Sequence, residues 1–185
     1  MNDTSLSIQW LYDHVTKLWG EQLPPDALDT VQQSGYYTTI IRPGLRLIAL
    51  NNNVCYVFNW WILYEVTSIQ TQFQWLHDVL LDAEAAGEKV HILAHVPNGE
   101  DYHKPCSREF RRIVDRFHGI ISAQFHGHRE YFGFNIFYEN NNESLPINIA
   151  WDGGSLASYS RVNRNYVVNT IDPVNFVSKS FYFKI

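Results

Sequence analysis

Two apolar runs that each stop at a histidine constrain this chain most strongly. Residues 90–94 run into His95 and a turn with proline and glycine, and residues 120–125 run into His126, a glycine and His128. In an α/β sheet, ligands gather beyond the carboxyl ends of the strands. Neutral imidazole binds zinc, iron and manganese-type ions. The two motifs together therefore predict a metal site, and loop histidines without any ligand are the alternative.

The order of these motifs resembles the second half of a calcineurin-type metallophosphoesterase, where a Gly-His-x-Pro strand end precedes Gly-His-x-His. More narrowly, the chain is similar to the acid sphingomyelinase branch of that family. The similarity extends from about residue 8 to the C-terminus and rests on residues 9–12, 43–51, 74–76, 89–93, 95–97 and 123–125. It implies an α/β fold of the α+β sandwich type, with a mixed sheet and flanking helices.

Motifs that open the catalytic domain of this family are missing from the sequence. They are an Asp-x-His strand end, then Gly-Asp, then Gly-Asn-His, and they supply further metal ligands and the histidine that protonates the leaving group. No Gly-Asp and no Asn-His dipeptide occurs here. Asp101 and His103 do spell Asp-x-His, but they lie in a polar stretch after the second-half motif and are treated as unrelated to it. The resemblance thus implies that residues 1–185 form a single, incomplete metallophosphoesterase-like domain.

The resemblance also assigns candidate metal ligands by position. His95 and His128 match the histidines that bind one metal of the pair, and Glu130 stands where the second histidine of the motif reaches the other metal. Residues two apart in an extended segment face the same way, so we expect Glu130 to point at the same site. Glutamate oxygen ligates zinc at about the same distance as histidine nitrogen. The cofactor implied is zinc in a two-metal site, of which this chain retains at most a part.

His126 leaves two alternatives open, because it occupies a place usually held by an apolar residue. His126 and His128 could form a shifted ligand pair, or His126 could be a partly buried histidine bonded to the backbone.

The activity implied by the resemblance is that of a metal-dependent phosphodiesterase, a phosphoric diester hydrolase that converts sphingomyelin to ceramide and phosphocholine. Its partner is a phosphodiester or sphingolipid substrate. We expect the 185 residues alone to be inactive, because three candidate ligands cannot fill two metal shells. One alternative is a non-catalytic, degenerate relative that binds metal or a partner, which Glu130, Asn98 and the missing motifs favour. The other is an unrelated structural α/β domain.

Composition narrows the classes of partner. Hydrophobic residues make up 45% of the chain and aromatic residues 15%, which predicts a folded core. The net charge is −5 without a basic run, which argues against nucleic acid. No run is long enough to cross a membrane, and residues 1–20 do not resemble a signal peptide.

Localisation is inferred from the family instead. Relatives of the acid sphingomyelinase type imply an extracellular or lysosomal glycoprotein, and sequons at Asn2 and Asn142 predict glycosylation. Cys55 and Cys106 resemble the bridged pair of the family, although Cys106 lies several residues later than in that pattern. Two unrelated thiols are the alternative.

Periodicity predicts the order of the elements. We expect helices at residues 5–19, after Pro24 and Pro25, at 71–86 and at 107–117, with a loop at 51–64. The strands are expected at residues 36–41, 45–50, 90–94, 120–125, 132–138, 146–150, 166–171 and 181–185. The first two strands form a hairpin, helices cover both apolar faces of the 90–94 strand, and the arginines of the 107–117 helix form a solvated face.

Overall fold

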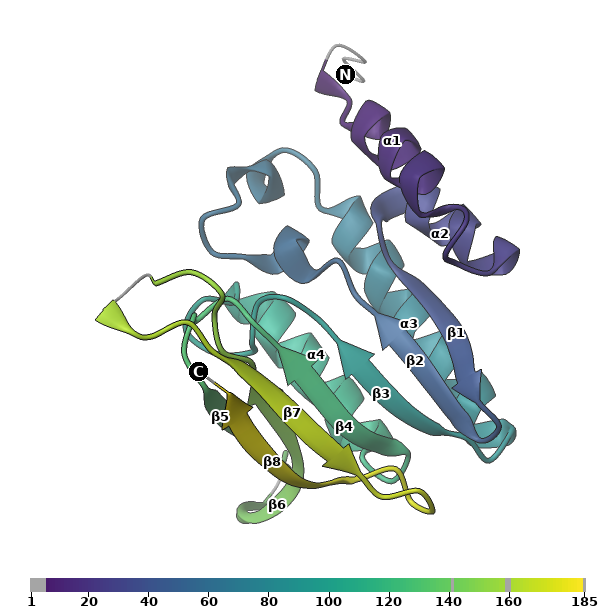
Figure 1. The fold of residues 1–185 in the computed structure, drawn as a ribbon. Coiled ribbons are helices and arrows are strands. Elements are labelled where there is room, and N and C mark those ends of the chain that lie inside the picture. The colour runs from purple at the N-terminus through teal and green to yellow at the C-terminus, as the bar shows by residue number, and fades with distance from the viewer. Residues whose placement is uncertain (1–5, 141, 159–160, 185) are drawn as a thin grey trace.

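The computed structural model describes residues 6–140, 142–158 and 161–184. At its centre is a mixed sheet in the order β1-β2-β3-β4-β6-β5 (Figure 1). Strands β2, β3, β4 and β6 are parallel, and β1 and β5 run antiparallel at the two edges. The strands are β1 (Tyr37–Arg42), β2 (Leu45–Ala49), β3 (Lys89–Leu93), β4 (Ile121–His126), β5 (Gly133–Glu139) and β6 (Asn142–Asp152). The predicted mixed α/β architecture is confirmed.

Helices α3 (Thr67–Ala85) and α4 (Lys104–Phe117) cover one face of the sheet (Figure 1). Their apolar positions recur with the helical period and meet the inner faces of β2, β3 and β4. The fully buried side chains of this layer include Ile48, Leu76, Leu80, Val90, Ile92, Phe110, Val114 and Phe117. Helices α1 (Gln9–Trp19) and α2 (Pro25–Ser34) pack against each other beside β1.

Strands β7 (Tyr166–Ile171) and β8 (Ser178–Lys184) form a separate two-stranded sheet. This sheet lies over the opposite face of the main sheet (Figure 1), so helices do not cover both faces of β3 as expected from the sequence. Aromatic side chains explain the arrangement: Phe181 packs against Phe132 and Trp151 at ring distances of 4.7 and 5.1 Å. The second sheet thus shields apolar surface that helices would otherwise have to cover.

The segment between β2 and α3 contains two short 3₁₀ helices, η2 (Asn52–Cys55) and η3 (Trp60–Leu63). Helix α3 begins four residues before its predicted start. The reason is the Glu65 carboxylate, which accepts hydrogen bonds from the free backbone N–H groups of Thr67 and Ser68. Such capping satisfies donors that the first turn of a helix leaves unpaired.

Cys55 and Cys106 form a disulfide, with Cα atoms 6.0 Å apart. The same contact is reinforced by the backbone, where the N–H of His103 donates to the carbonyl of Cys55 over 2.7 Å. The displaced position of Cys106 is tolerated because it lies in the first turns of α4, which bring it back over η2.

The predicted sequons have different outcomes. Asn142 is exposed but opens strand β6, where the sequence suggested a polar loop. It pairs in register with Glu139 across the β5–β6 hairpin. Asn2 lies outside the described residues. Among the helices of the described residues, none has the length and apolar content of a membrane span.

Removal of the disulfide should destabilise the chain. The bridge closes a loop with a sequence separation of 51 residues, which is worth about 4 kcal/mol on the chain-entropy description. A Cys55→Ser, Cys106→Ser double variant should therefore lose about this much unfolding free energy in urea titrations, and reduced wild type should match it. An unchanged unfolding midpoint would contradict the prediction.

Acid should weaken the attachment of the second sheet through His91 in β3. Its ring is 6% exposed, and its Nε2 lies 2.7 Å from the carbonyl of Phe176 in the β7–β8 connection. Burial lowers the pKa of His91 below its ordinary value. The unfolded chain therefore binds more protons as the pH falls through about 6.5, and stability decreases there.

A His91→Gln variant removes this titration and keeps a donor for Phe176. Its unfolding free energy, measured in urea between pH 7.5 and 5, should depend less on pH than that of wild type. His14→Gln, at an exposed position of α1, is the matched control. Equal pH slopes for His91→Gln and wild type would exclude this role.

Candidate metal centre

The loops that follow β3 and β4 lie side by side because these strands are parallel neighbours. Leu93 pairs in register with Phe125, and the ladder continues beyond both strands. The N–H of Ala94 donates to the carbonyl of Phe125 over 3.0 Å, and the N–H of Gly127 donates to the carbonyl of His95 over 2.9 Å. Backbone pairing alone therefore brings the two histidine motifs of the sequence to one edge of the sheet.

Asn52 of η2 fixes the loop after β3. Its buried side-chain oxygen accepts hydrogen bonds of 3.0 Å from the N–H groups of both His95 and Val96, and its amide donates to the carbonyl of Val96. One side chain thus satisfies three backbone groups that a strand end leaves unpaired. The sequence showed only a loop rich in asparagine at this point, and no local signal marked Asn52.

His95 and His128 face each other across this edge. The Nε2 of His95 lies 3.3 Å from the Nδ1 of His128, with the rings 82° apart. Nitrogens sharing a tetrahedral ion at metal–nitrogen bonds of about 2.0–2.1 Å lie roughly 3–4 Å apart. The pair therefore fits one ion. Partial burial, and then the nearby His128 imidazole, lower the pKa of His95 and favour the neutral form that binds metal.

The loop that carries His128 and Glu130 is not extended, contrary to the expectation from the sequence. Both residues have left-handed backbone conformations, with φ of 73° and 62°. Non-glycine residues rarely adopt this region without support from their surroundings. Between them, Arg129 donates to Asp152 over 3.0 Å and to Asn135 over 3.3 Å. Arg129 therefore anchors the loop to β5 and β6.

Glu130 nevertheless lies in the same cleft as the histidine pair. The cleft has a volume of about 590 Å³ and is lined by His95, Gly127, His128, Arg129, Glu130, Gly154, Ser155 and Leu156. The Oε2 atom of Glu130 is buried there and has no hydrogen-bond partner. A buried carboxylate oxygen without a partner is costly, so a cation or a donor is needed beside it.

His126 lies in the interior at the end of β4. It is 6% exposed, and its Nδ1 is 3.3 Å from the carbonyl of Val96. Burial lowers its pKa to about 4. The structure thus brings His95, rather than His126, next to the ring of His128, and the backbone-bonded alternative describes His126.

Asp101 lies next to the site, although its sequence context gave no reason to connect it with the metal motifs. Its carboxylate lies 3.8 Å from the Nε2 of His128, on the side away from His95. The backbone carbonyl of Asp101 accepts a 3.0 Å hydrogen bond from the N–H of Val57. No sequence signal could have placed Asp101 here, because its position depends on how the loop before α4 folds back.

The donor set is incomplete. Among the described residues, no group of three or more His, Cys, Asp and Glu side chains is arranged to hold a metal. His95 and His128 are a convergent pair, and Glu130 lines the same cleft without completing a three-residue group. The residues present thus fit part of a metal shell.

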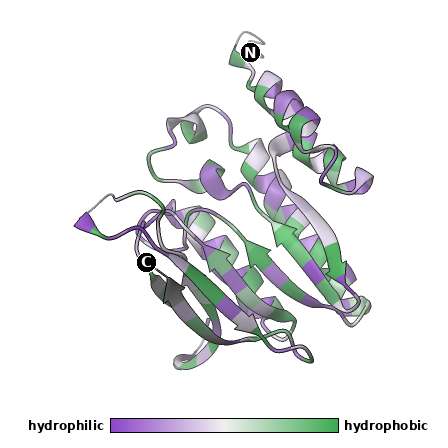
Figure 2. Ribbon diagram, viewed as in Figure 1, coloured by the Kyte–Doolittle hydropathy of each residue, from purple (hydrophilic) through white to green (hydrophobic). Residues whose placement is uncertain are grey.

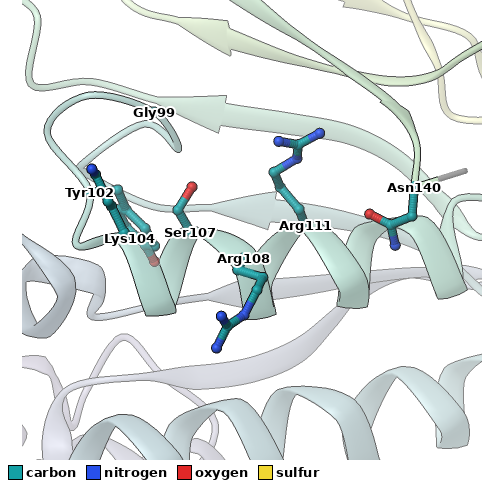
Figure 3. Close-up of a pocket in the computed structure, with 7 residues that line it drawn as sticks. All are labelled: Gly99, Tyr102, Lys104, Ser107, Arg108, Arg111 and Asn140. Atoms are coloured by element: carbon teal, nitrogen blue, oxygen red, sulfur yellow. The ribbon is translucent and has the colours of Figure 1, made fainter. Parts of the chain in front are cut away.

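A second cleft, of about 370 Å³, lies beside α4 and is lined by Gly99, Tyr102, Lys104, Ser107, Arg108, Arg111 and Asn140. Figure 3 shows that Arg108 and Arg111 point to different sides of the helix. Arg108 instead pairs with Glu109 over 3.2 Å. These arginines therefore do not converge on a single anion, in agreement with the solvated face predicted from the sequence.

Loss of the Arg129 anchor should disturb both stability and the site. Asp152 is fully buried, and the Arg129 side chain is 22% exposed. Burial raises the pKa of Asp152 despite the neighbouring Arg129, so the ion pair compensates only part of the desolvation of the carboxylate. An Asp152→Asn variant, which weakens the bond to the partly exposed Arg129, should therefore lose about 1–3 kcal/mol of unfolding free energy. It should also shift the imidazole NMR signals of His128. Arg112→Gln, which breaks the exposed pair with Glu109, is the control. Equal losses in the two variants would show that the buried pair has no special role.

Comparison with known proteins supplies the family. The chain is 40% identical over 166 residues to human sphingomyelin phosphodiesterase and 39% identical over 166 residues to the bovine protein, in each case over 90% of this chain and 26% of the relative. Sphingomyelin phosphodiesterase 2 of Caenorhabditis elegans is 36% identical over 166 residues, covering 89% of this chain and 27% of that protein. The chain thus spans about a quarter of the length of these relatives. No protein-family model matches it.

The fold has a counterpart among solved structures. A dimetal phosphatase from Danio rerio superimposes with a TM-score of 0.54 and 12% identity, over 75% of this chain and 55% of that one. At this identity the likeness concerns the fold alone. Sequence similarity over nine tenths of the chain and the shared architecture agree, and the chain belongs to the acid sphingomyelinase-like family of the metallophosphoesterases.

Proposed function

We propose that the chain forms the C-terminal half of the catalytic domain of a metal-dependent phosphodiesterase that cleaves sphingomyelin or a closely related phosphodiester. The observation that carries the proposal is the 3.3 Å approach of the His95 and His128 nitrogens at the carboxyl edge of parallel strands. The names of the relatives, sphingomyelin phosphodiesterases at 36–40% identity, support the substrate class. This chain covers only about a quarter of the length of those proteins, so their activity is extended to it as part of the proposal.

In this proposal the metal is zinc, and His95 and His128 bind one ion through the facing nitrogens. Glu130, whose buried Oε2 has no partner, replaces a histidine as a ligand of the second ion. A carboxylate brings one more negative charge than imidazole and thus lowers the Lewis acidity of its metal. In the proposal, the remaining ligands would come from the part of the catalytic domain that these 185 residues do not contain.

Neighbouring residues hold His95 and His128 in the positions in which they would bind the ion. Asp101 lies 3.8 Å from the Nε2 of His128, the ring nitrogen that does not face His95. Asn52 fixes the backbone of His95, and Arg129 fixes the loop of His128. When bound, two metal ions supply an activated water and neutralise the phosphoryl oxygens for in-line displacement. Sphingomyelin would then yield ceramide and phosphocholine.

The proposed location is extracellular or lysosomal, and the protein is proposed to be a glycoprotein. A disulfide in the structure supports an oxidising compartment, and the exposed position of Asn142 is compatible with a glycan.

A second candidate function is a degenerate relative that binds metal or a partner without catalysis. It is favoured by the absence of a three-residue metal group among residues 6–140, 142–158 and 161–184, and by Glu130 in place of histidine.

Two measurements test the proposal. The isolated chain should bind zinc or cobalt through His95 and His128 and should hydrolyse neither sphingomyelin nor bis(p-nitrophenyl) phosphate. A chimera that carries this chain in place of the aligned segment of human sphingomyelin phosphodiesterase should hydrolyse sphingomyelin. His128→Ala should reduce that activity by at least about 10–100-fold, the scale already seen when only an outer-shell partner of a metal ligand is lost.

Asp78→Asn, an exposed acid on α3, is the control in the chimera. A folded chimera without activity would contradict the catalytic proposal and favour the degenerate relative. Metal-dependent turnover by the isolated chain, abolished by His128→Ala, would instead show that the 185 residues form a complete site.

A further inference from the structure

The segment between η2 and α3, residues 57–66, presents an unusual number of apolar side chains to solvent. Trp60 is 74% exposed, Leu63 80% and Phe58 64%, and three further apolar residues of the segment exceed one third exposure: Val57, Tyr64 and Val66. Figure 2 shows this loop standing out from the end of the sheet, with hydrophobic residues interspersed among paler and hydrophilic ones. Large apolar groups concentrated on a surface mark an interaction site rather than a folding requirement.

This surface, which we call the aromatic segment, is held in place by its base. The Cys55–Cys106 disulfide lies directly before it, and Tyr56 forms an antiparallel bridge with Tyr102. Within the segment, the Asn59 side chain accepts from the N–H of Trp61 and donates to the carbonyl of Asn53. The apolar side chains therefore face solvent from an ordered backbone.

The aromatic segment is continuous with the candidate metal centre. The ring of Tyr56 contacts Phe58 edge-on at 5.5 Å and His128 edge-on at 4.9 Å. A single ring thus connects the exposed segment to a proposed metal ligand. Behind the segment, an apolar hollow of about 380 Å³ opens between Ile62, Val66, Phe73 and Pro105.

The lack of charge in this segment favours a lipid partner over a polar one. Residues 51–64 contain no charged side chain, and Glu65 is turned back to cap α3. Tryptophan and tyrosine combine an apolar ring with one polar group, and such residues collect at the boundary between lipid and water. The surface therefore suits the interfacial region of a bilayer, with insertion driven by apolar burial rather than by attraction to charged headgroups.

We propose that the aromatic segment docks the protein on the surface of a lipid bilayer and brings the metal centre to a phosphodiester at that surface. The proposal deepens the proposed function and rests on it for the nature of the substrate. Docking itself involves only Phe58, Trp60, Leu63 and their neighbours, so it does not depend on metal.

The experiment measures binding of the 185-residue chain to vesicles of phosphatidylcholine and sphingomyelin, in EDTA, by sedimentation and by tryptophan fluorescence. Binding should persist when salt is raised from low to high concentration, because the segment is uncharged. Trp60→Ala and Leu63→Asp should each weaken vesicle binding by about tenfold or more, the scale expected for loss of one large inserted side chain.

Val174→Asp is the matched control. Val174 is 84% exposed and lies in the β7–β8 connection, at the opposite end of the sheet from the aromatic segment (Figure 1). Its substitution should leave binding unchanged. Because all three residues are exposed, the variants should keep the circular dichroism and unfolding midpoint of wild type. A loss of binding shared equally by Val174→Asp would overturn the proposal.

Other outcomes are equally decisive. If light scattering shows a dimer that Leu63→Asp dissociates, and vesicles do not bind, the segment is an interface between copies and the proposal is wrong. In the active chimera, loss of vesicle binding by Leu63→Asp without loss of sphingomyelin hydrolysis in bilayers would also overturn it. His128→Ala should bind vesicles normally. Vesicle binding by a catalytically inactive chimera would count against the proposed function alone.

Discussion

Parallel pairing of β3 with β4 is the constraint on which the rest of the candidate site depends. Since the strands run in the same direction, their carboxyl ends meet, and two further backbone hydrogen bonds carry the pairing into the loops of His95 and Gly127. The imidazoles approach to 3.3 Å as a consequence. Asn52 then fixes the first of these loops through its hydrogen bonds to His95 and Val96. The pairing of the strands thus determines which two loops meet, and the loops then orient the side chains of the site.

The second half of the site depends on a loop in a strained conformation. His128 and Glu130 both have positive φ, and between them Arg129 ties the loop to the buried Asp152 of β6. Several polar atoms near this loop are buried without partners, among them Nε2 of His126, Oε2 of Glu130 and Oδ1 of Asp152. Buried polar atoms without partners are costly, and in the proposed centre the second ion would be the partner of Glu130.

Much of the fold could be predicted from periodicity. The helix at α3, the β1–β2 hairpin and the strands β3 and β4 followed from apolar spacing and turn residues, because burial in a two-layer core imposes those patterns. The family, the pairing of Cys55 with Cys106 and the candidate ligands came from resemblance. The separate β7–β8 sheet could not be predicted, since alternation marks a strand but does not say which sheet it joins. The same holds for Asn142, which opens a strand instead of lying in a loop.

The sequence by itself identified His95, His128 and Glu130 as candidate ligands and placed the two histidine motifs after buried strands. It also determined an uncharged, aromatic stretch at residues 51–64. Only the tertiary structure decided that His95 rather than His126 faces His128, that Asp101 lies beside the pair, and that the aromatic stretch is exposed next to them. The physical reason is that a ligand pair and a surface are relations between distant segments. Those relations are fixed by strand register, by hydrogen bonds of the loops and by one disulfide. None of these three features can be predicted from local sequence alone.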